Sequence, residues 1–157
     1  MTDATWPDFT VRRVDARELQ GLRRRVLRAD NPESSVADPR DDEASALHYG
    51  GFLGERLVAS ASWFASEPPV NPERRSYQLR YMAIDLDVQG RGYGATMLAT
   101  AMRDLRDLGA EQLWANARDT ALGFYLATGW TAVPGSEHVS RETQLPHTVI
   151  FISLTDG

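Results

Sequence analysis

Strand-like patterns of hydrophobic and polar residues dominate the first third of this chain. Residues 9–14 alternate apolar and polar side chains, as a strand with one buried face does. Two further strand-like segments, residues 46–53 and 57–64, flank the turn sequence Gly54-Glu55-Arg56. Because a short turn that contains glycine is enough to reverse the chain, these two segments predict an antiparallel hairpin.

A helix is predicted between the first two of these strands. Asp15 followed by Glu18 resembles a capping box, in which two side chains bond backbone N–H groups at the start of a helix. Apolar residues then keep helical spacing from Leu19 to Leu27. Residues 30–45 are polar and lack a period, which predicts a loop. We expect the arginines of the helix to form its solvated face; they are Arg23, Arg24, Arg25 and Arg28.

The rest of the chain alternates strands with helices. A strand at residues 77–86 leads into a glycine-rich turn, and a helix with one apolar stripe follows at residues 96–108. Further predicted elements are a strand at 112–116, a helix at 120–128 and strands at 131–133 and 148–154. The order β-α-β-β-β-α-β-α-β-β predicts an α/β fold in which helices pack on a mixed sheet.

The length and composition are those of an ordinary globular domain. We expect one domain over residues 1–157, because a chain of this size can bury a core of its own. It is 42% hydrophobic and 25% charged. No apolar run approaches the roughly 20 residues of a membrane span, so no membrane partner is expected. The first residues lack the basic and apolar regions of a secretory signal, which favours a cytoplasmic protein.

Cysteine content and charge narrow the chemistry further. The chain has no cysteine, so it has no disulfide and no thiolate nucleophile or thiolate ligand, and we expect no metal site. A formal net charge of -5 argues against nucleic acid as a partner, because such binding depends on excess positive charge. The same net charge favours a cationic partner.

The segment Gln89-Gly90-Arg91-Gly92-Tyr93-Gly94-Ala95 combines a glycine-rich turn with the start of a helix. Glycines let the backbone approach a ligand, and the helix offers unpaired N–H groups to phosphate oxygens. The segment also satisfies the dinucleotide pattern Gly-x-Gly-x-x-Ala, although the next strand ends in Asn116 rather than in an acidic residue. A P-loop is excluded because no Gly-Lys-Ser/Thr follows. A purely conformational need for glycine is the remaining alternative.

The flanks of this turn resemble the GNAT superfamily of acetyl-CoA-dependent N-acetyltransferases. Gln89-x-x-Gly92-x-Gly94-Ala95 is similar to the pyrophosphate-binding signature of that family. A second block of the family is similar to Asn116-Ala117-Arg118 and Ala121-x-x-Phe124-Tyr125-x-x-x-Gly129-Trp130, about 30 residues further on. The similarity covers roughly residues 77–133, while the preceding part fits the topology of the family more than its sequence.

The resemblance implies a GNAT-like fold, with a mixed, mostly antiparallel central sheet flanked by helices, and acetyl-CoA as co-substrate. The N–H groups of residues 90–95 would bind the pyrophosphate, and the backbone of residues 82–84 would pair with pantetheine amides where the strand parts from its neighbour. Arg91 equally fits a solvated turn, and Asn116 a cap. The residues thus assigned to the cofactor are Met82, Ala83, Ile84, Gln89, Gly90, Arg91, Gly92, Tyr93, Gly94, Ala95 and Asn116.

Tyr125 is the candidate catalytic residue, because it matches the family tyrosine that lies near the thiol of the cofactor. A phenol with a pKa near 10 is protonated at neutral pH and suited to donate to a departing thiolate. The absence of cysteine fits direct attack by the amine rather than an acyl-enzyme. The alternative is that Phe124 and Tyr125 form an aromatic pair that packs the helix on the sheet.

No general base is evident from the sequence. Four residues lie on segments that we expect near the acceptor: His48, Arg80, Glu142 and His147. A histidine with a pKa near 6.5 suits proton transfer from an ammonium group. We expect His48, Arg80 and His147 to contact the acceptor, although each also fits a polar strand residue. The central strand lacks the glutamate of many family members.

Together these features predict an N-acetyltransferase that moves an acetyl group from acetyl-CoA to a primary amine of a small molecule or peptide. An alternative is a non-catalytic acyl-CoA-binding or regulatory domain of the same fold, which would not need the hydroxyl group of Tyr125. The irregular last strands leave room for pairing between subunits, as in a homodimer.

Overall fold

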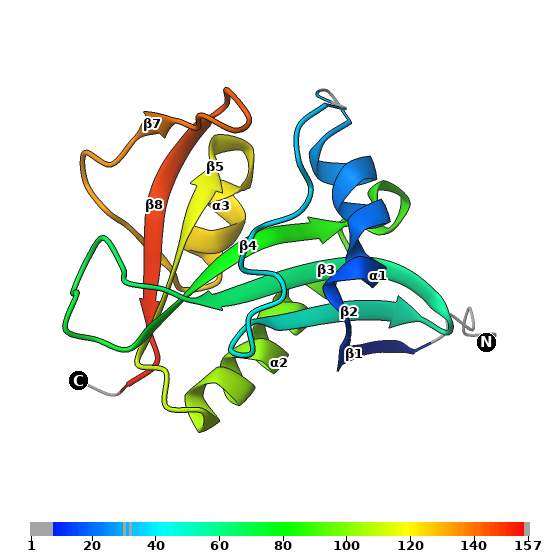
Figure 1. Cartoon of the computed structure of the whole chain (residues 1–157), viewed down its shortest axis with the longest axis horizontal. Helices are drawn as coiled ribbons and strands as arrows, with labels where there is room; N and C mark the ends of the chain where they lie inside the picture. Colours follow the sequence, from blue (N-terminus) through cyan, green and yellow to red (C-terminus); the bar gives the residue numbers. More distant parts are fainter. Residues whose placement is uncertain (1–7, 30, 32, 156–157) are drawn as a thin grey trace.

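Eight strands form one mixed sheet, which we describe from a computed structural model over residues 8–29, 31 and 33–155 (Figure 1). The strands run in the order β1-β2-β3-β4-β5-β8-β6, and β7 pairs with β8 outside this path. All paired strands are antiparallel except β4 and β5, which are parallel. The predicted fold class, a mixed and mostly antiparallel sheet flanked by helices, is confirmed.

The elements have the following bounds. On one side of the parallel pair the strands are β1 (Phe9–Arg13), β2 (Leu47–Leu53), β3 (Arg56–Ala65) and β4 (Ser76–Ile84). On the other side they are β5 (Gln112–Arg118), β6 (Thr131–Ala132), β7 (His138–Val139) and β8 (Pro146–Ser153). The helices are α1 (Ala16–Leu22), the π-helical turn η1 (Arg23–Leu27), the 3-10 turn η2 (Leu86–Val88), α2 (Tyr93–Asp107) and α3 (Asp119–Ala127).

Local signals in the sequence place most of these elements correctly. The capping box is confirmed, because the Asp15 carboxylate accepts from the N–H of Arg17 at 2.9 Å and the Glu18 carboxylate accepts from the N–H of Asp15 at 3.1 Å. Several predicted boundaries are wrong by two or three residues, since α2 begins at Tyr93, β4 ends at Ile84, β5 ends at Arg118 and β8 begins at Pro146. The sequence also missed β7, which is too short to show a period.

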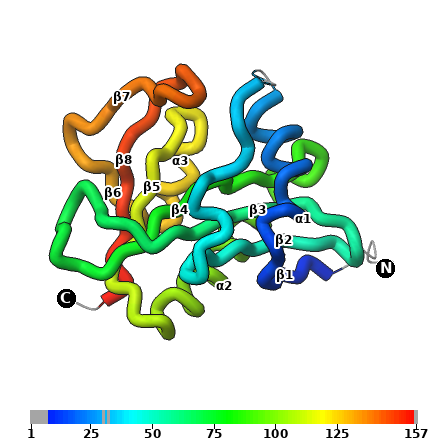
Figure 2. Tube along the Cα trace, in the orientation of Figure 1, coloured from blue at the N-terminus to red at the C-terminus, as the bar shows by residue number. Residues whose placement is uncertain are grey.

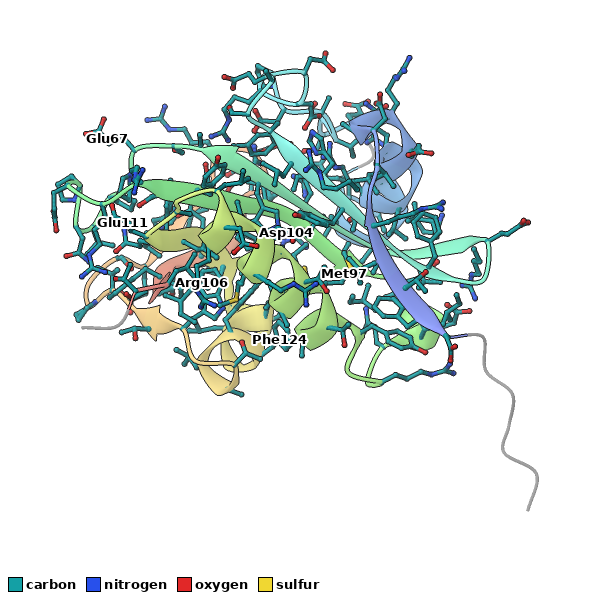
Figure 3. All side chains as sticks on the ribbon, turned by 90° about the horizontal axis from the view of Figure 1, so that it is seen from below. Glu67, Met97, Asp104, Arg106, Glu111 and Phe124 are labelled. Carbon is teal, nitrogen blue, oxygen red and sulfur yellow. The ribbon has the colours of Figure 1, made fainter. Side chains whose placement is uncertain are left out.

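The sheet separates two layers of helices. Figures 1 and 3 show α1 and η1 on one face and α2 and α3 on the other. The apolar stripe of α2, with Met97 and Leu105 fully buried, belongs to the same core as the inner residues of the strands. The chain between η1 and β2 runs back over the face that carries α1 (Figure 2). Within the described residues, no helix has the length and apolar character needed to cross a bilayer.

β4 and β5 are paired over only part of their length. The register runs from Ser76 opposite Gln112 to Leu79 opposite Ala115. Beyond this point β4 stays paired with β3 and β5 with β8, and the two arrows diverge in Figure 1. Because β4 lacks a neighbouring strand along residues 80–84 on this side, the backbone groups there that no side chain bonds can bond a ligand or water.

A bulge at Tyr81 marks the start of this divergence. The φ angle of Tyr81 is 56°, a left-handed conformation that costs a non-glycine residue roughly 1–2 kcal/mol. The register with β3 shifts between Ser60 and Ser62, and the hydroxyl of Ser60 donates to the carbonyl of Tyr81 at 2.9 Å. A bulge of this kind bends the strand and changes the direction of its end. The bulge therefore accounts for the divergence of β4 from β5.

Only part of the predicted solvated face of arginines is confirmed, because Arg25 is exposed and Arg24 half-buried, but the other two are buried. Arg23 is fully buried, and Arg28 is only 5% exposed. Arg23 donates to both carboxylate oxygens of Asp41, at 3.0 and 3.3 Å, to the carbonyl of Val36 at 2.8 Å and to the hydroxyl of Ser62 at 2.7 Å. The prediction was wrong for Arg23 because its acceptors come from distant parts of the chain, which helical spacing does not show.

Replacing Arg23 tests the role of this network in stability. Arg23→Ala leaves the buried carboxylate of Asp41 without its partner, and breaking a buried ion pair costs about 3–5 kcal/mol. We expect the free energy of unfolding, measured by urea titration, to fall by about that amount. Arg17→Ala removes an exposed pair with Asp15 and should shift the urea midpoint far less. Equal shifts for the two variants would contradict the network.

Candidate active site

A cleft of about 1010 Å³ opens where β4 and β5 diverge. Its walls include β4 from Gln78 to Ile84, the glycine turn, and β5 from Ala115 to Arg118. α3 contributes Phe124 and Tyr125, while the end of η1 and the segment between β7 and β8 line the cleft as well. The free edge of β4 therefore lies along a cavity rather than against another element.

The glycine turn forms one end of this cleft. Gly90 and Gly92 both have φ of 83°, in the region that favours glycine over other residues. α2 begins directly afterwards at Tyr93, and no side chain caps this end of the helix. Because the first N–H groups of a helix have no partner within the helix, those of residues 93–95 point to this end together with the positive end of the helix dipole. Such an arrangement suits a phosphate group.

Gly94 has a packing role in addition. A Cβ atom at this position would lie 3.1 Å from the ring of Phe124 and 3.5 Å from the methyl group of Met82. The missing side chain therefore lets the first turn of α2 approach α3 and β4 closely. The third glycine of the segment is explained by this contact, since Gly94 has no positive φ.

Most residues predicted to bind the cofactor line the cleft. They are Met82, Ala83, Ile84, Gln89, Gly90, Gly92, Tyr93, Gly94 and Asn116. Arg91 and Ala95 are exposed and do not line it. The side chain of Gln89 donates to the carbonyl of Ile84 at 3.0 Å, so it ties the turn to β4. Asn116 is exposed on β5. The binding roles of all these residues stay predictions.

Tyr125 reaches the cleft from α3 and also belongs to the core. It is only 6% exposed, and its ring packs edge-on against Phe124 and Trp130, with centroids 5.2 and 5.5 Å apart. Burial raises the pKa of the phenol, so the hydroxyl stays protonated at neutral pH. The packing interpretation is therefore correct for the ring, and it is compatible with the predicted role of the hydroxyl as a proton donor.

His147 lines the cleft from the start of β8. It lies opposite Arg118 of β5 and stacks on His138, with ring centroids 5.9 Å apart. Its Nδ1 is 2.8 Å from the carbonyl oxygen of Leu145, and because a carbonyl only accepts, Nδ1 carries the proton. Burial lowers the pKa of His147, so the ring is neutral near pH 7 and keeps a lone pair on Nε2.

Arg80 also lines the cleft, but two carboxylates hold it in place. Its guanidinium donates to Asp38 at 2.7 Å and bonds Glu142. Burial works against the charge of Arg80, but the neighbouring carboxylates outweigh this effect and raise its pKa. Arg80 is thereby excluded as a base. Glu142 contacts Arg28 as well, at 3.3 Å, so its two carboxylate oxygens each bond a guanidinium group.

His48 does not reach the cleft. It is 5% exposed, its Nδ1 lies 2.8 Å from the hydroxyl of Ser62, and its Nε2 lies 2.9 Å from the carbonyl of Asp41. The expectation that His48 contacts the acceptor is therefore wrong. The sequence misled because every residue of β2 is buried, so a polar residue in this strand bonds inside the protein instead of facing an open side.

The sequence also missed an excess of arginine around the cleft. Glu142 is the only carboxylate among the lining residues, and in the described part of the chain no three histidine or acidic residues gather as metal ligands do. The charge around the cleft is therefore opposite in sign to the net charge on which the expectation of a cationic partner rested. No local motif marks the lining arginines, because they come from separate segments: Arg28, Arg40, Arg80, Arg118 and Arg141.

Known proteins are similar to this chain in sequence and in fold. A model described as the acetyltransferase (GNAT) family matches residues 6–130. The uncharacterized N-acetyltransferase YitI of Bacillus subtilis (strain 168) is 27% identical over 120 residues, which are 76% of this chain and 80% of YitI.

Solved structures of low sequence identity show the same fold. FeeM, an N-acyl amino acid synthase from uncultured soil microbes, matches with a TM-score of 0.77 and 14% identity over 97% of this chain and 93% of its own. An acyl-CoA N-acyltransferase from Pseudomonas aeruginosa matches with a TM-score of 0.71 and 19% identity over 93% of this chain and 99% of its own.

Gly92→Ala tests the conformation of the glycine turn. Space around Gly92 is open, so the added methyl group acts through its φ of 83° alone, and the free energy of unfolding should fall by roughly 1–2 kcal/mol. Gly21→Ala is the matched control, because Gly21 also has open space but lies within α1, where alanine should stabilise by up to about 1 kcal/mol. Urea titration measures both. A stabilised Gly92→Ala variant would contradict the left-handed turn.

Proposed function

Because the chain belongs to the acetyltransferase (GNAT) family, we propose that it transfers an acetyl group from acetyl-CoA to a primary amine. Membership of the family establishes an acyltransferase; the acetyl donor, the amine acceptor and the residue roles are the proposal. YitI is named an N-acetyltransferase and FeeM an N-acyl amino acid synthase, which supports nitrogen as the receiving atom. The amine would belong to a small molecule or a peptide.

The observation that carries the proposal is the continuous path from the glycine turn along the free edge of β4 to Tyr125. The N–H groups of residues 93–95 suit the pyrophosphate of acetyl-CoA at one end. The unpaired edge at residues 82–84 suits the amides of pantetheine, which would add to β4 as a strand does. The thioester would then lie near α3, where Tyr125 lines the cleft.

Tyr125 is the proton donor in this proposal. The neutral amine attacks the carbonyl carbon of the thioester, the carbon–sulfur bond breaks, and the thiolate leaves with the electron pair. The hydroxyl of Tyr125 donates a hydrogen bond and then its proton to that sulfur. Burial raises the pKa of Tyr125, so its hydroxyl still carries the proton when the thiolate departs.

His147 is the base that the geometry supports best. Among the candidates from the sequence, Arg80 holds its proton, His48 lies outside the cleft, and Glu142 is bound by two arginines. His147 has its tautomer fixed by Leu145 and its Nε2 unprotonated. It would take the proton of the amine directly or through water.

Tyr125→Phe separates this proposal from a non-catalytic acyl-CoA-binding domain. Removing the hydroxyl should lower turnover at least tenfold, because a general acid contributes roughly 10²–10⁴-fold. The affinity for acetyl-CoA, from calorimetry, should hardly change, since the ring and its packing are retained. Tyr77→Phe is the control, as it removes a hydroxyl on β4 outside the cleft. Unchanged CoA release by Tyr125→Phe would remove the catalytic role.

Acetyl-CoA should raise the melting temperature of the protein by mass action. A ligand at 100 times its dissociation constant adds about 2.7 kcal/mol of stability. Thermal unfolding with acetyl-CoA, with longer acyl-CoA and with NAD then distinguishes the cofactor classes. A shift with NAD alone would support the interpretation of the glycine turn as a dinucleotide-binding site. A larger shift with a longer acyl-CoA would indicate that the donor carries a longer acyl group than acetyl, and the proposal of acyl transfer would stand.

The pH dependence of kcat/KM should identify His147. Burial lowers the pKa of His147 below 6.5, so the neutral base dominates above that pH and activity should be lost as the pH falls through the lowered value. His147→Asn keeps an N–H for the carbonyl of Leu145 but removes Nε2. This variant should lose activity at neutral pH and also lose the acid limb of the profile. An acid limb that persists in the variant would assign the titration to another group.

A further inference from the structure

The part of the cleft away from the glycine turn would receive the amine, and we call it the acceptor half. It is positively charged, although the protein as a whole is acidic. Its lining residues include five arginines and one carboxylate, Glu142, whereas the chain has a formal net charge of -5. The arginines come from the end of η1, the loop before β2, β4, the end of β5 and the segment between β7 and β8. Such convergence from five segments concentrates positive charge at one place in the fold.

Internal carboxylates balance only part of this charge. Asp38 bonds Arg40 at 2.9 Å and Arg80 at 2.7 Å, and Glu142 bonds Arg80 and Arg28. Three guanidinium groups thus share two carboxylates, which leaves one positive charge in excess within the cluster. Asp38 stays ionised, because the bonds from Arg40 and Arg80 outweigh the effect of burial and hold its pKa well below its usual range.

Arg141 adds a second excess charge. It lies next to Glu142 in the segment between β7 and β8, is exposed, and lines the cleft. Within the described residues its guanidinium makes no hydrogen bond or ion pair. An arginine that lines a cleft without an internal partner has its whole planar donor fork available for an anion.

The ring of Tyr81 packs against two arginines of the cluster and against the buried Arg23, while Arg40 lies over Phe64 at 4.4 Å. The guanidinium carbon atoms of Arg23, Arg80 and Arg28 lie 4.0, 4.6 and 5.8 Å from the centroid of the Tyr81 ring. Tyr81 is itself fixed by the bulge in β4. The charges are therefore pre-organised by packing, and binding an anion there would order few side chains.

The phosphates of the cofactor do not account for these arginines. A phosphate at the glycine turn has its own donors in the first turn of α2. Arg80 is four residues before Ile84 along β4, which is roughly 13 Å in an extended strand, and the turn lies beyond Ile84. The positive charge is therefore placed for a different anion, on the side of the cleft that would receive the amine.

We infer that the acceptor is an amine that carries a carboxylate, as an amino acid does. This inference rests on the proposed function, since it concerns the acceptor of the same cleft. The carboxylate would bind Arg141 and the excess charge of the Arg28–Arg40–Arg80 cluster, while the amine faces His147 and the thioester. A planar guanidinium fork fits a carboxylate in bidentate geometry, and a substrate that lacks this group leaves the arginines without an anion.

Matched sets of amines test the inference by CoA release. Each set contains an amino acid, its amide and the amine that lacks the carboxyl group: alanine, alaninamide and ethylamine, or phenylalanine, phenylalaninamide and 2-phenylethylamine. We expect kcat/KM to be at least tenfold higher for the amino acid than for either analogue. The amide is the decisive comparison, because its amine has a lower pKa than that of the amino acid and gains reactivity from this difference.

Arg141→Gln links the preference to the cleft. This variant should raise KM for the amino acid about tenfold, leave KM for the amide unchanged, and retain most of kcat. Arg103→Gln, which removes the same charge from an exposed position on α2 outside the cleft, is the control and should change neither. If both variants raise KM for the amino acid equally, the effect of Arg141 comes from the net charge of the protein and not from its place in the cleft, and the inference is overturned.

The remaining outcomes are distinguishable. If amines without a carboxylate are acetylated as well as or better than amino acids, the inference fails and the proposed function stands. If an aminoalkylphosphonate is preferred over the matched amino acid, the anion is a phosphoryl group and the carboxylate is wrong. If no amine releases CoA and acetyl-CoA leaves the melting temperature unchanged, the proposed function itself has failed.

Discussion

The separation of β4 from β5 beyond Leu79 and Ala115 is the constraint on which the site depends. Two parallel strands that stayed paired would satisfy their backbone groups within the sheet and leave no room between them. Here the strands part, so the N–H and C=O groups on one side of β4 need partners from outside the sheet. The cleft, the glycine turn at one end and Tyr125 on α3 are arranged around that unsatisfied edge.

The divergence of β4 from β5 is stabilised by residues on the face of the sheet that carries α1 and η1, opposite to α2 and α3. Tyr81 adopts its left-handed conformation at the point of separation, and its ring packs against three arginines. Arg23, the innermost of them, is fixed by Asp41 and Ser62. A buried ion pair is a weak source of net stability, but it has a defined geometry. The same side chains that hold the bulge in place also bring positive charge to the acceptor half of the cleft.

Local chemistry made much of the fold and of the cofactor end predictable from the sequence. The capping box at Asp15 and the glycines at residues 90 and 92 depend on neighbours within a few positions, so their residue types define their conformation. The position of α3 follows in the same way, because Gly129, which lies two residues after the last helical residue and has a φ of 103°, is a local stop signal. The free edge of β4 came only from a family resemblance, since strand pairing is not local.

The acceptor half was much less predictable for a physical reason. Arg23 looks solvated by helical spacing, yet its acceptors lie 13 and more residues away along the chain. His48 looks available in a strand, yet β2 is buried throughout. Arg141 is a candidate binding residue only because the segment between β7 and β8 lines the cleft. Burial and charge balance are sums over distant segments, and no window of the sequence contains them.

Hydrogen exchange with and without acetyl-CoA tests most directly the claim that the divergence of β4 and β5 is the cofactor site. Unpaired amides at a free strand edge and at the first turn of a helix exchange rapidly. The account predicts that acetyl-CoA slows exchange in residues 82–84 and 93–95, and leaves the β1–β2 region unchanged. Protection that appears elsewhere, with exchange in these two segments unaffected, would contradict it.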